Sequence, residues 1–380
     1  MALLFNYDGK KGEQEIFKIS NKIKKRKFNI NESYLIKGDN FKVLSSMMGI
    51  YKNKIDLIYI DPPYNTNRIF KSSLNRNNTI SSEEDGEVAY SDNLTQEEYF
   101  EFIRERLFLL RELLSEEGSI YLHIDYKIGH YIKIIMDEIF GIENFKNDIS
   151  RIKSNPKNFG RKAYGNQKDM ILFYAKNSNK NIFNNITIPL TNEEIVERFN
   201  KIDKDGRRYT TVPVHAPGET KDGETGGLWK GMYPPKGRHW RYSPDKLTEL
   251  DEKGLIEWSK TGNPRIKNFA DEHKGKKVQD IWEYKDPTYP VYPTEKNEDL
   301  LKFIIRQSSN KDSIVLDCFS GSGTTLKAAS ELGRRFIGID NSDIAIEATK
   351  KKLEDANYNF LDIENGEEIK ILTNTQLKMI

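Results

Sequence analysis

Four consecutive residues, Asp61-Pro62-Pro63-Tyr64, combine a carboxylate, two rigid turn residues and an aromatic ring. They follow the apolar run 55–60, which is typical of a short buried strand. Two successive prolines remove two backbone donors and stiffen the turn, so the Asp61 and Pro62 carbonyls can face a ligand. The set suits a flat molecule with an exocyclic amine, whose protons the carboxylate and a carbonyl accept while its ring stacks on Tyr64. Asp and Pro are also ordinary turn residues, so a purely structural turn explains the same residues.

A second candidate is the glycine-rich segment 317–325, between a strand-like and a helix-like run. Gly321 and Gly323 permit a tight turn and close backbone approach to a ligand, with a helix N-terminus behind them. Such a turn fits a dinucleotide, another nucleoside cofactor or plain packing. The complete dinucleotide fingerprint is absent, because Leu326 stands where glycine or alanine is required.

Two carboxylates border this turn. Asp340 ends the next strand-like run, where an acidic residue can bind ribose hydroxyls. A helix cap ahead of Ser342 is the structural alternative for Asp340. Asp317 precedes the turn and could be an ordinary turn residue.

The composition narrows the class of protein. The 380 residues carry 60 Lys and Arg against 58 Asp and Glu, and this balance argues neither for nor against a nucleic-acid partner. No apolar run approaches a membrane span, and the apolar start of the chain is too short for a signal peptide. The single cysteine, Cys318, excludes an internal disulfide, fits a reducing cytosol and is expected in the core. The histidines and this cysteine lack a metal-ligand spacing, so no metal site is predicted.

The elements that must position both motifs alternate between strands and helices. Strands are predicted over 34–37, 55–60, 119–124, 148–152, 169–174, 314–318 and 335–339. Helices are predicted over 40–48, 95–115, 127–140, 295–308, 323–332 and 342–355. The helix from 95 begins with a capping-box pattern, Thr95 and Glu98. Residues 65–93 lack apolar periodicity and are interpreted as a mobile functional loop or lid.

Together, the two motifs resemble those of the DNA amino-methyltransferases, which use S-adenosyl-L-methionine. Asp61-Pro62-Pro63-Tyr64 matches the family's catalytic motif, D/N/S-P-P-Y/F. The family's cofactor motif is matched by Asp317, Phe319, Gly321, Gly323, Thr324 and Thr325. The catalytic motif comes first in the chain, an order that resembles the β group of the family, a circular permutation of the methyltransferase fold.

Two further elements resemble cofactor-side elements of the group. Pro293, Thr294 and Lys296 match the core of a His-Pro-Thr-x-Lys-Pro element, although Tyr292 replaces its His and Asn297 its last Pro. Asp39, in a Gly-Asp pair, resembles the carboxylate that contacts the cofactor adenine. Asp340 would hold the cofactor ribose.

The resemblance implies an α/β fold, a circularly permuted, seven-stranded, mostly parallel Rossmann-like sheet with an inserted target-recognition region. The catalytic half would span 33–179 and the cofactor half 291–357, so that the strand ends of both halves meet at one cleft. The region 180–290, with many Gly, Pro, Trp and Tyr residues, would be the target-recognition region. An N-terminal extension, 1–32, and a C-terminal tail, 358–380, would complete the chain.

The implied reaction is direct methyl transfer to an exocyclic amine in double-stranded DNA. The Asp61 carboxylate and the Pro62 carbonyl would accept hydrogen bonds from the amine and direct its lone pair at the methyl group, with no cysteine attack on the base. The base must flip out of the duplex and stack on Tyr64. An Asp in the first position favours adenine N6. A homodimer, a cognate restriction endonuclease and a prokaryotic cytoplasmic, nucleoid-associated location are expected, without membrane or metal.

Basic side chains gather in residues 151–180, where eight Lys and Arg accompany one acid, Asp169. A second basic group in residues 236–246 includes Trp240 and Tyr242. A solvated face is the usual explanation of such charge runs, and the aromatic rings fit a small core equally well. Contacts with phosphates or base edges are predicted for Lys153, Lys157, Arg161, Lys162, Arg238 and Arg241.

Other functions remain open at this point. The same amine chemistry serves a cytosine N4 methyltransferase or an RNA amino-methyltransferase. A DNA-binding specificity subunit with an inactive cofactor site belongs to a different class, although the intact motifs at 61–64 and 317–325 argue against it. A nucleotide-dependent oxidoreductase is disfavoured by the incomplete dinucleotide fingerprint.

Overall fold

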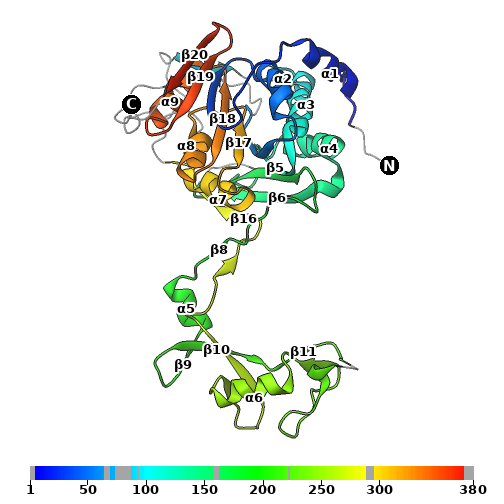
Figure 1. Cartoon of the computed structure of the whole chain (residues 1–380), viewed down its shortest axis with the longest axis vertical. Helices are drawn as coiled ribbons and strands as arrows, with labels where there is room; N and C mark the ends of the chain where they lie inside the picture. Colours follow the sequence, from blue (N-terminus) through cyan, green and yellow to red (C-terminus); the bar gives the residue numbers. More distant parts are fainter. Residues whose placement is uncertain are drawn as a thin grey trace. The chain divides into compact units, whose positions relative to one another are not determined.

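The computed structural model describes residues 5–63, 69–72, 87–91, 94–156, 162–220, 223–287 and 295–371. The chain divides into two compact units (Figure 1). The first comprises Met1–Asn185 and Gln279–Ile380, and the second comprises Ile186–Val278. The second unit lies inside the region predicted to recognise the target.

A ten-stranded sheet forms the centre of the first unit, with the order β16-β6-β7-β5-β2-β17-β18-β1-β19-β20. In that order the strands are Ile281–Glu283, Phe145–Ile152, Lys168–Ala175, Leu114–Ile124, Ile55–Ile60, Ile314–Asp317, Arg335–Asp340, Tyr34–Lys37, Tyr358–Asp362 and Glu367–Ile371. Neighbouring strands are parallel except where β7 pairs with β5 and β6 and where β20 pairs with β19. The α/β, mostly parallel fold is therefore confirmed.

The two halves of the chain interleave within this sheet. β17 and β18, from the second half, lie between β1 and β2, from the first half. The seven strands from β6 to β1 match the expected seven-stranded sheet, and β16, β19 and β20 extend it at both edges. The residues expected as a C-terminal tail thus begin with two sheet strands. The residues of β19 are buried, and β20 pairs with β19 at the edge of the sheet.

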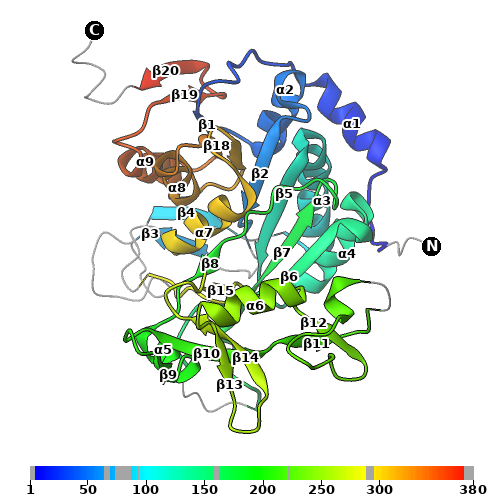
Figure 2. The same ribbon diagram turned by 60° about the horizontal axis from the view of Figure 1, so that its bottom comes forward.

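Helices cover both faces of the sheet (Figures 1 and 2). One layer contains α1 (Glu13–Lys22), α2 (Asn40–Tyr51), α3 (Gln96–Leu113) and α4 (Gly129–Phe140), followed by the 3-10 helix η1 (Ile142–Asn144). The other contains α7 (Glu298–Ser308), α8 (Thr324–Glu331) and α9 (Asp343–Lys352). The predicted capping box begins α3: Glu98 N donates to Thr95 Oγ1, and Thr95 N donates to the Glu98 carboxylate.

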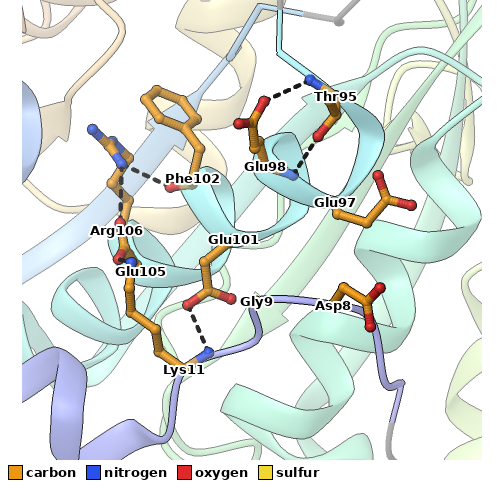
Figure 3. Close-up of a pocket in the computed structure, with 10 residues that line it drawn as sticks. All are labelled: Asp8, Gly9, Lys11, Thr95, Glu97, Glu98, Glu101, Phe102, Glu105 and Arg106. Atoms are coloured by element: carbon orange, nitrogen blue, oxygen red, sulfur yellow. Dashed lines mark hydrogen bonds and ion pairs between the residues drawn. The ribbon is translucent and has the colours of Figure 1, made fainter.

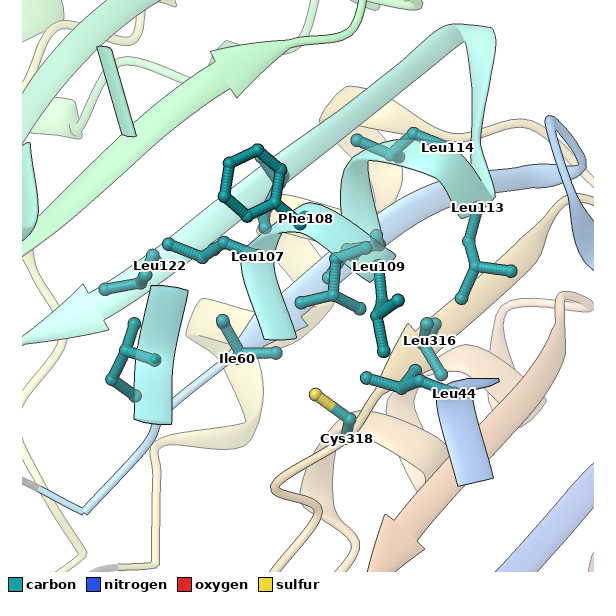
Figure 4. Close-up of a cluster of buried hydrophobic side chains, with 14 of the residues drawn as sticks. Leu44, Ile60, Leu107, Phe108, Leu109, Leu113, Leu114, Leu122, Leu316 and Cys318 are labelled. Carbon is teal, nitrogen blue, oxygen red and sulfur yellow. The ribbon is translucent and has the colours of Figure 1, made fainter. Parts of the chain in front are cut away.

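The main core lies between the sheet and the first helix layer (Figure 4). Side chains of α2 and α3, such as Leu44 and Leu107, pack there against Ile60 and Leu316 of the strands. Cys318 is buried in the same cluster, as predicted. The core includes part of the expected N-terminal extension: Ile16 of α1 is completely buried in it.

The segment 65–93 differs from the expected irregular loop in its described part. β3 (Ile69–Ser72) and β4 (Glu87–Ser91) form an antiparallel pair there. A role of this segment as a lid stays a prediction. Within the described ranges, no helix is long and apolar enough to cross a membrane, and no group of His, Cys, Asp and Glu could hold a metal ion.

The second unit has its own small core. A four-stranded sheet has the order β13-β14-β10-β9, and two strand pairs are β11–β12 and β8–β15. From β8 to β15 the strands are Thr187–Ile188, Lys201–Ile202, Arg208–Pro213, His215–Pro217, Arg238–Trp240, Ile256–Trp258, Pro264–Phe269 and Lys276–Lys277. Its helices are α5 (Asn192–Arg198), η2 (Glu224–Gly226) and α6 (Pro244–Glu252). Trp229 and Trp240 are buried edge to face, so Trp240 serves this core, whereas Tyr242 is exposed.

Candidate active site

The predicted catalytic motif follows the carboxyl end of β2. Asp61 is partly buried and Pro62 is buried; Tyr64 lies outside the described residues. β2 pairs with β17 in parallel, with Leu57 opposite Val315. Because parallel strands end at the same edge of a sheet, the motif after β2 and the glycine-rich loop after β17 emerge side by side. The strand order therefore brings together two segments that lie more than half the chain apart.

Lys296 joins this edge from a third segment. Its Nζ forms an ion pair with Asp61 Oδ2, and the two side chains are only 11% and 15% exposed. Lys296 was predicted on the cofactor side, and the structure places its ammonium group on the predicted catalytic carboxylate. A cofactor contact of Lys296 stays a prediction, and Pro293 and Thr294 lie outside the described residues.

Asp317 supports the glycine-rich loop from inside. Its Oδ1 accepts a hydrogen bond from Phe319 N at 3.0 Å, and its Oδ2 accepts one from Thr325 Oγ1 at 2.6 Å. The carboxyl is 2% exposed. Burial raises its pKa to about 7, against the lowering effect of both hydrogen bonds, and the charge of Asp61 raises it further. The site therefore holds a buried carboxyl group that titrates close to neutral pH.

Asp340 holds the loop from the neighbouring strand. Its Oδ2 accepts from Gly321 N at 2.8 Å and its Oδ1 from Ser342 N at 3.0 Å. Burial raises its pKa to about 6, although part of the residue is exposed. Ser342 itself is the N-cap of α9, so Asp340 supports both the loop and the start of that helix.

The loop depends on Gly323, where it enters α8. Gly323 has φ of +74°, and an added Cβ would lie 2.6 Å from Thr349 Cγ2. Thr349 Oγ1 donates to the Gly321 carbonyl at 2.9 Å, which fixes α9 against the turn. Any larger residue at position 323 would be strained and would also push this helix away.

Asp39 is connected to the glycine-rich loop by a series of hydrogen bonds. It caps α2 by accepting from Lys42 N at 3.0 Å, and its Oδ2 accepts from Arg106 Nη2 at 3.2 Å. Arg106 Nε also donates to Asn40 Oδ1 at 2.5 Å, and Asn40 Nδ2 donates to the Cys318 carbonyl at 2.9 Å. The predicted Asp39 is thus tied to the cofactor loop by two residues that were not predicted.

The sequence does carry a signal for Arg106. It lies three residues after Ile103 and four before Leu110, so it falls on the apolar face of α3. Its guanidinium stacks on the Phe102 ring at 3.6 Å, and the Phe102 and Phe319 rings are 6.0 Å apart. A pocket of about 700 Å³ with several acidic side chains adjoins it, between residues 8–11 and α3 (Figure 3).

A buried polar network lies behind the catalytic motif. The Tyr59 hydroxyl is 2.9 Å from His123 Nδ1, and His123 Nε2 is 3.2 Å from Asp169 Oδ2. Asp169 also pairs with Lys153 at 2.5 Å and with the buried Arg151 at 3.5 Å. Burial would raise the pKa of Asp169, but the hydrogen bond from His123 and the nearby positive charges hold it well below its usual range.

This network bears on the predicted DNA contacts. The Lys153 ammonium group is held by Asp169 in the described structure, so contact with phosphate would require it to change partner. Lys162, Arg238 and Arg241 are exposed. Lys157 and Arg161 lie outside the described residues, and all six contacts stay predictions.

Comparisons with known proteins show what the chain is similar to. A family profile described as DNA methylase matches residues 55–351. The chain is 40% identical over 361 residues to the type II methyltransferase M.EcaI of Enterobacter cloacae, covering 91% of this chain and 76% of that protein. It is 27% identical over 375 residues to the type III restriction-modification enzyme StyLTI Mod subunit of Salmonella typhimurium, covering 89% of this chain but only 56% of the Mod subunit. A crystal structure of an M1.HpyAVI–SAM complex has a TM-score of 0.44 at 19% identity, covering 84% of this chain and 100% of that one.

Proposed function

The chain belongs to the DNA methylase family, and from that premise we propose that it methylates the N6 amine of adenine in double-stranded DNA. The family covers both adenine N6 and cytosine N4 methyltransferases. One observation carries the proposal: Asp61-Pro62-Pro63 and the glycine-rich loop follow two neighbouring parallel strands, β2 and β17, at the same edge of the sheet. Asp61 in the first position of the motif favours adenine.

The cofactor is S-adenosyl-L-methionine, which supplies an electrophilic sulfonium methyl group when bound. The residues at the loop fit such a molecule. Gly321 and Gly323 have φ of 49° and 74°, which forms the tight turn between β17 and α8, and Thr349 leaves no space for a side chain at position 323. Asp317 and Asp340 place two buried or partly buried acidic groups there, which suits a ligand that carries positive charge.

Asp61 and Pro62 position the target amine. The carboxylate and the Pro62 carbonyl accept its two protons in hydrogen bonds, which favours a tetrahedral nitrogen with its lone pair directed outward. As the methyl group arrives, the nitrogen becomes positive, and the Asp61 charge stabilises it until the proton leaves. Lys296, paired with Asp61 Oδ2, holds the carboxylate in one orientation. Positioning and electrostatics therefore carry the step.

The remaining parts of the proposal concern DNA. The base flips out of the duplex, because its amine is inaccessible within it, and Tyr64 provides a stacking face. The unit 186–278 reads the target sequence, and basic residues, including Lys162, Arg238 and Arg241, contact phosphates. The protein acts in a restriction-modification system in the cytoplasm, with a cognate endonuclease, and as a homodimer.

Product analysis tests the proposal. The purified chain is incubated with methyl-labelled S-adenosyl-L-methionine and unmethylated genomic DNA, and the nucleosides are then separated. We expect N6-methyladenine; N4-methylcytosine would overturn the choice of base, and label in RNA but not DNA would overturn the substrate.

Two variants test whether methyl transfer depends on Asp61. Asp61→Ala should abolish transfer while leaving cofactor affinity nearly unchanged. The exposed Asp148, on β6, provides a matched control, and Asp148→Ala should methylate as the wild type does. Loss of cofactor binding in Asp61→Ala, with normal turnover at saturating cofactor, would contradict the role of Asp61.

A further inference from the structure

Glu295 and Lys296 are consecutive in the chain, yet their side chains bind two different parts of the site. Lys296 Nζ pairs with Asp61 Oδ2, on the catalytic motif. Glu295 Oε1 pairs with Lys352 Nζ at 2.5 Å, on α9. All four side chains are between 11% and 15% exposed, so both ion pairs are largely shielded from solvent.

Lys352 extends the second contact to the cofactor loop. Its Nζ also donates to Ser322 Oγ at 3.1 Å and to Thr324 Oγ1 at 2.8 Å. These two hydroxyls flank Gly323, the position at which the loop turns into α8. Glu295 therefore holds the ammonium group that in turn holds the loop.

A continuous set of polar contacts thus runs from the loop to the catalytic carboxylate. It passes from Ser322 and Thr324 through Lys352 to Glu295, along one peptide bond to Lys296, and on to Asp61. A displacement of the loop that moves Lys352 also moves the backbone that carries Lys296. Shielded ion pairs transmit such displacements well, because breaking one leaves a poorly solvated charge.

We propose that Glu295 and Lys296 couple the cofactor loop to the catalytic carboxylate, so that cofactor binding and capture of the target base favour each other. This inference rests on the proposed function and adds to it a positioning role for this pair of residues. Contact of the cofactor with the loop orders Lys352 and Glu295. Lys296 then holds Asp61 Oδ2, which leaves the other carboxylate oxygen to accept a hydrogen bond from the target amine. By linkage, an amine on Asp61 strengthens cofactor binding by the same factor.

The test measures this factor directly by binding. The DNA probe is a fluorophore-labelled duplex oligonucleotide that contains the methylated site mapped in genomic DNA. Adenine is kept at the target position, and 2-aminopurine stands at the neighbouring position, where its stacking changes when the adenine flips out. The cofactor probe is sinefungin, an analogue that cannot transfer a methyl group. The Kd of the DNA is measured by anisotropy and base flipping by 2-aminopurine fluorescence, each without and with saturating sinefungin. We expect sinefungin to tighten DNA binding by the wild type about tenfold, within the usual range of coupling between sites.

Four substitutions, singly and in one double variant, separate loss of coupling from general damage to the protein. Lys296→Gln should reduce the factor to below about twofold, measured at a sinefungin concentration that saturates the variant itself. Lys296→Arg should retain part of the coupling. In an Asp61→Asn background, Lys296→Gln should have no further effect, because the ion pair is already absent. Lys302→Gln is the matched control, since Lys302 forms ion pairs with Glu298 and Glu331 on α7 and α8, away from Asp61.

Several results would overturn the inference: no coupling in the wild type, an unchanged factor in Lys296→Gln, or an equal loss in Lys302→Gln. The methylation assay separates these results from failure of the proposed function. If the wild type methylates DNA but the factor does not depend on Lys296, only the coupling is wrong. If the wild type methylates no nucleic acid, the proposed function is wrong and the coupling loses its basis.

Discussion

Replacing Asp317 with asparagine should stabilise the protein without cofactor and weaken cofactor binding. Burial raises the pKa of Asp317 from 3.8 to about 7. At about 1.4 kcal/mol per pH unit, this difference corresponds to about 4 kcal/mol of stability that the ionised carboxylate costs above pH 7. Asparagine carries no charge and can keep both hydrogen bonds, accepting from Phe319 N and donating to Thr325 Oγ1.

The sign of the pH dependence follows from proton binding. Between about pH 4 and pH 7 the folded carboxyl keeps a proton that the unfolded chain has lost, so the Asp317 contribution to stability falls as pH rises. Below that window both states are protonated, and above it the cost is complete. The advantage of Asp317→Asn should therefore grow by about 2 kcal/mol between pH 5.5 and pH 8.5.

Urea unfolding, followed by circular dichroism at both pH values, measures this change. Asp148→Asn, at an exposed position, is the control and should show no pH-dependent difference from the wild type. The proposed cofactor role of Asp317 predicts at least a tenfold weaker cofactor Kd for Asp317→Asn in isothermal titration at pH 8.5, because the variant lacks a negative charge near the cationic ligand. An advantage that is equal at the two pH values, or a variant less stable than the wild type at pH 8.5, would refute the reasoning.

Three shorter predictions concern other parts of the molecule. Asp169→Asn should destabilise the first unit by about 3 kcal/mol in urea unfolding, because Lys153 and the buried Arg151, which keeps Asp286, both lose a charge partner. A loss below about 1 kcal/mol would contradict a structural role. Gly323→Ala should lower the free energy of unfolding by about 2 kcal/mol or more, because of the positive φ and the contact with Thr349. Unchanged cofactor affinity of this variant in isothermal titration would count against the loop as the binding site. Arg241→Gln should weaken DNA binding similarly for all sequences and reduce the slope of log Kd against log salt by about one; an unchanged slope excludes a phosphate contact.

The two motifs were predictable because their signals are local. The apolar run before Asp61 and the capping box at Thr95 each depend on residues within a few positions of one another. The order of the two motifs along the chain also led to the permuted α/β fold, which the strand order confirms. The α1 helix and the β19–β20 pair were not predicted, because their local patterns are weak. Ile16 of α1 and Leu361 of β19 are buried in the core, and β20 is held by its pairing with β19.

Ion pairs between residues that are distant in the chain could not be predicted from the sequence. Nothing near Lys296 indicates that its ammonium group lies on Asp61, and nothing near Arg106 names Asp39 as its partner. The same holds for the buried contacts of Asp169, a residue that the charge pattern presented only as the single acid in a basic segment.

The sequence by itself determined which residues form the two motifs and in which order they occur, and it predicted which side chains hold an amine and which turn holds a nucleoside cofactor. Only the tertiary structure decided how these groups are charged, oriented and connected. The physical reason is that local backbone preferences act over a few residues, whereas burial and ion pairing depend on which distant segments the sheet brings to one edge. Asp317 shows the difference: its place in the motif is visible in the sequence, but its pKa of about 7 arises only from the core around it.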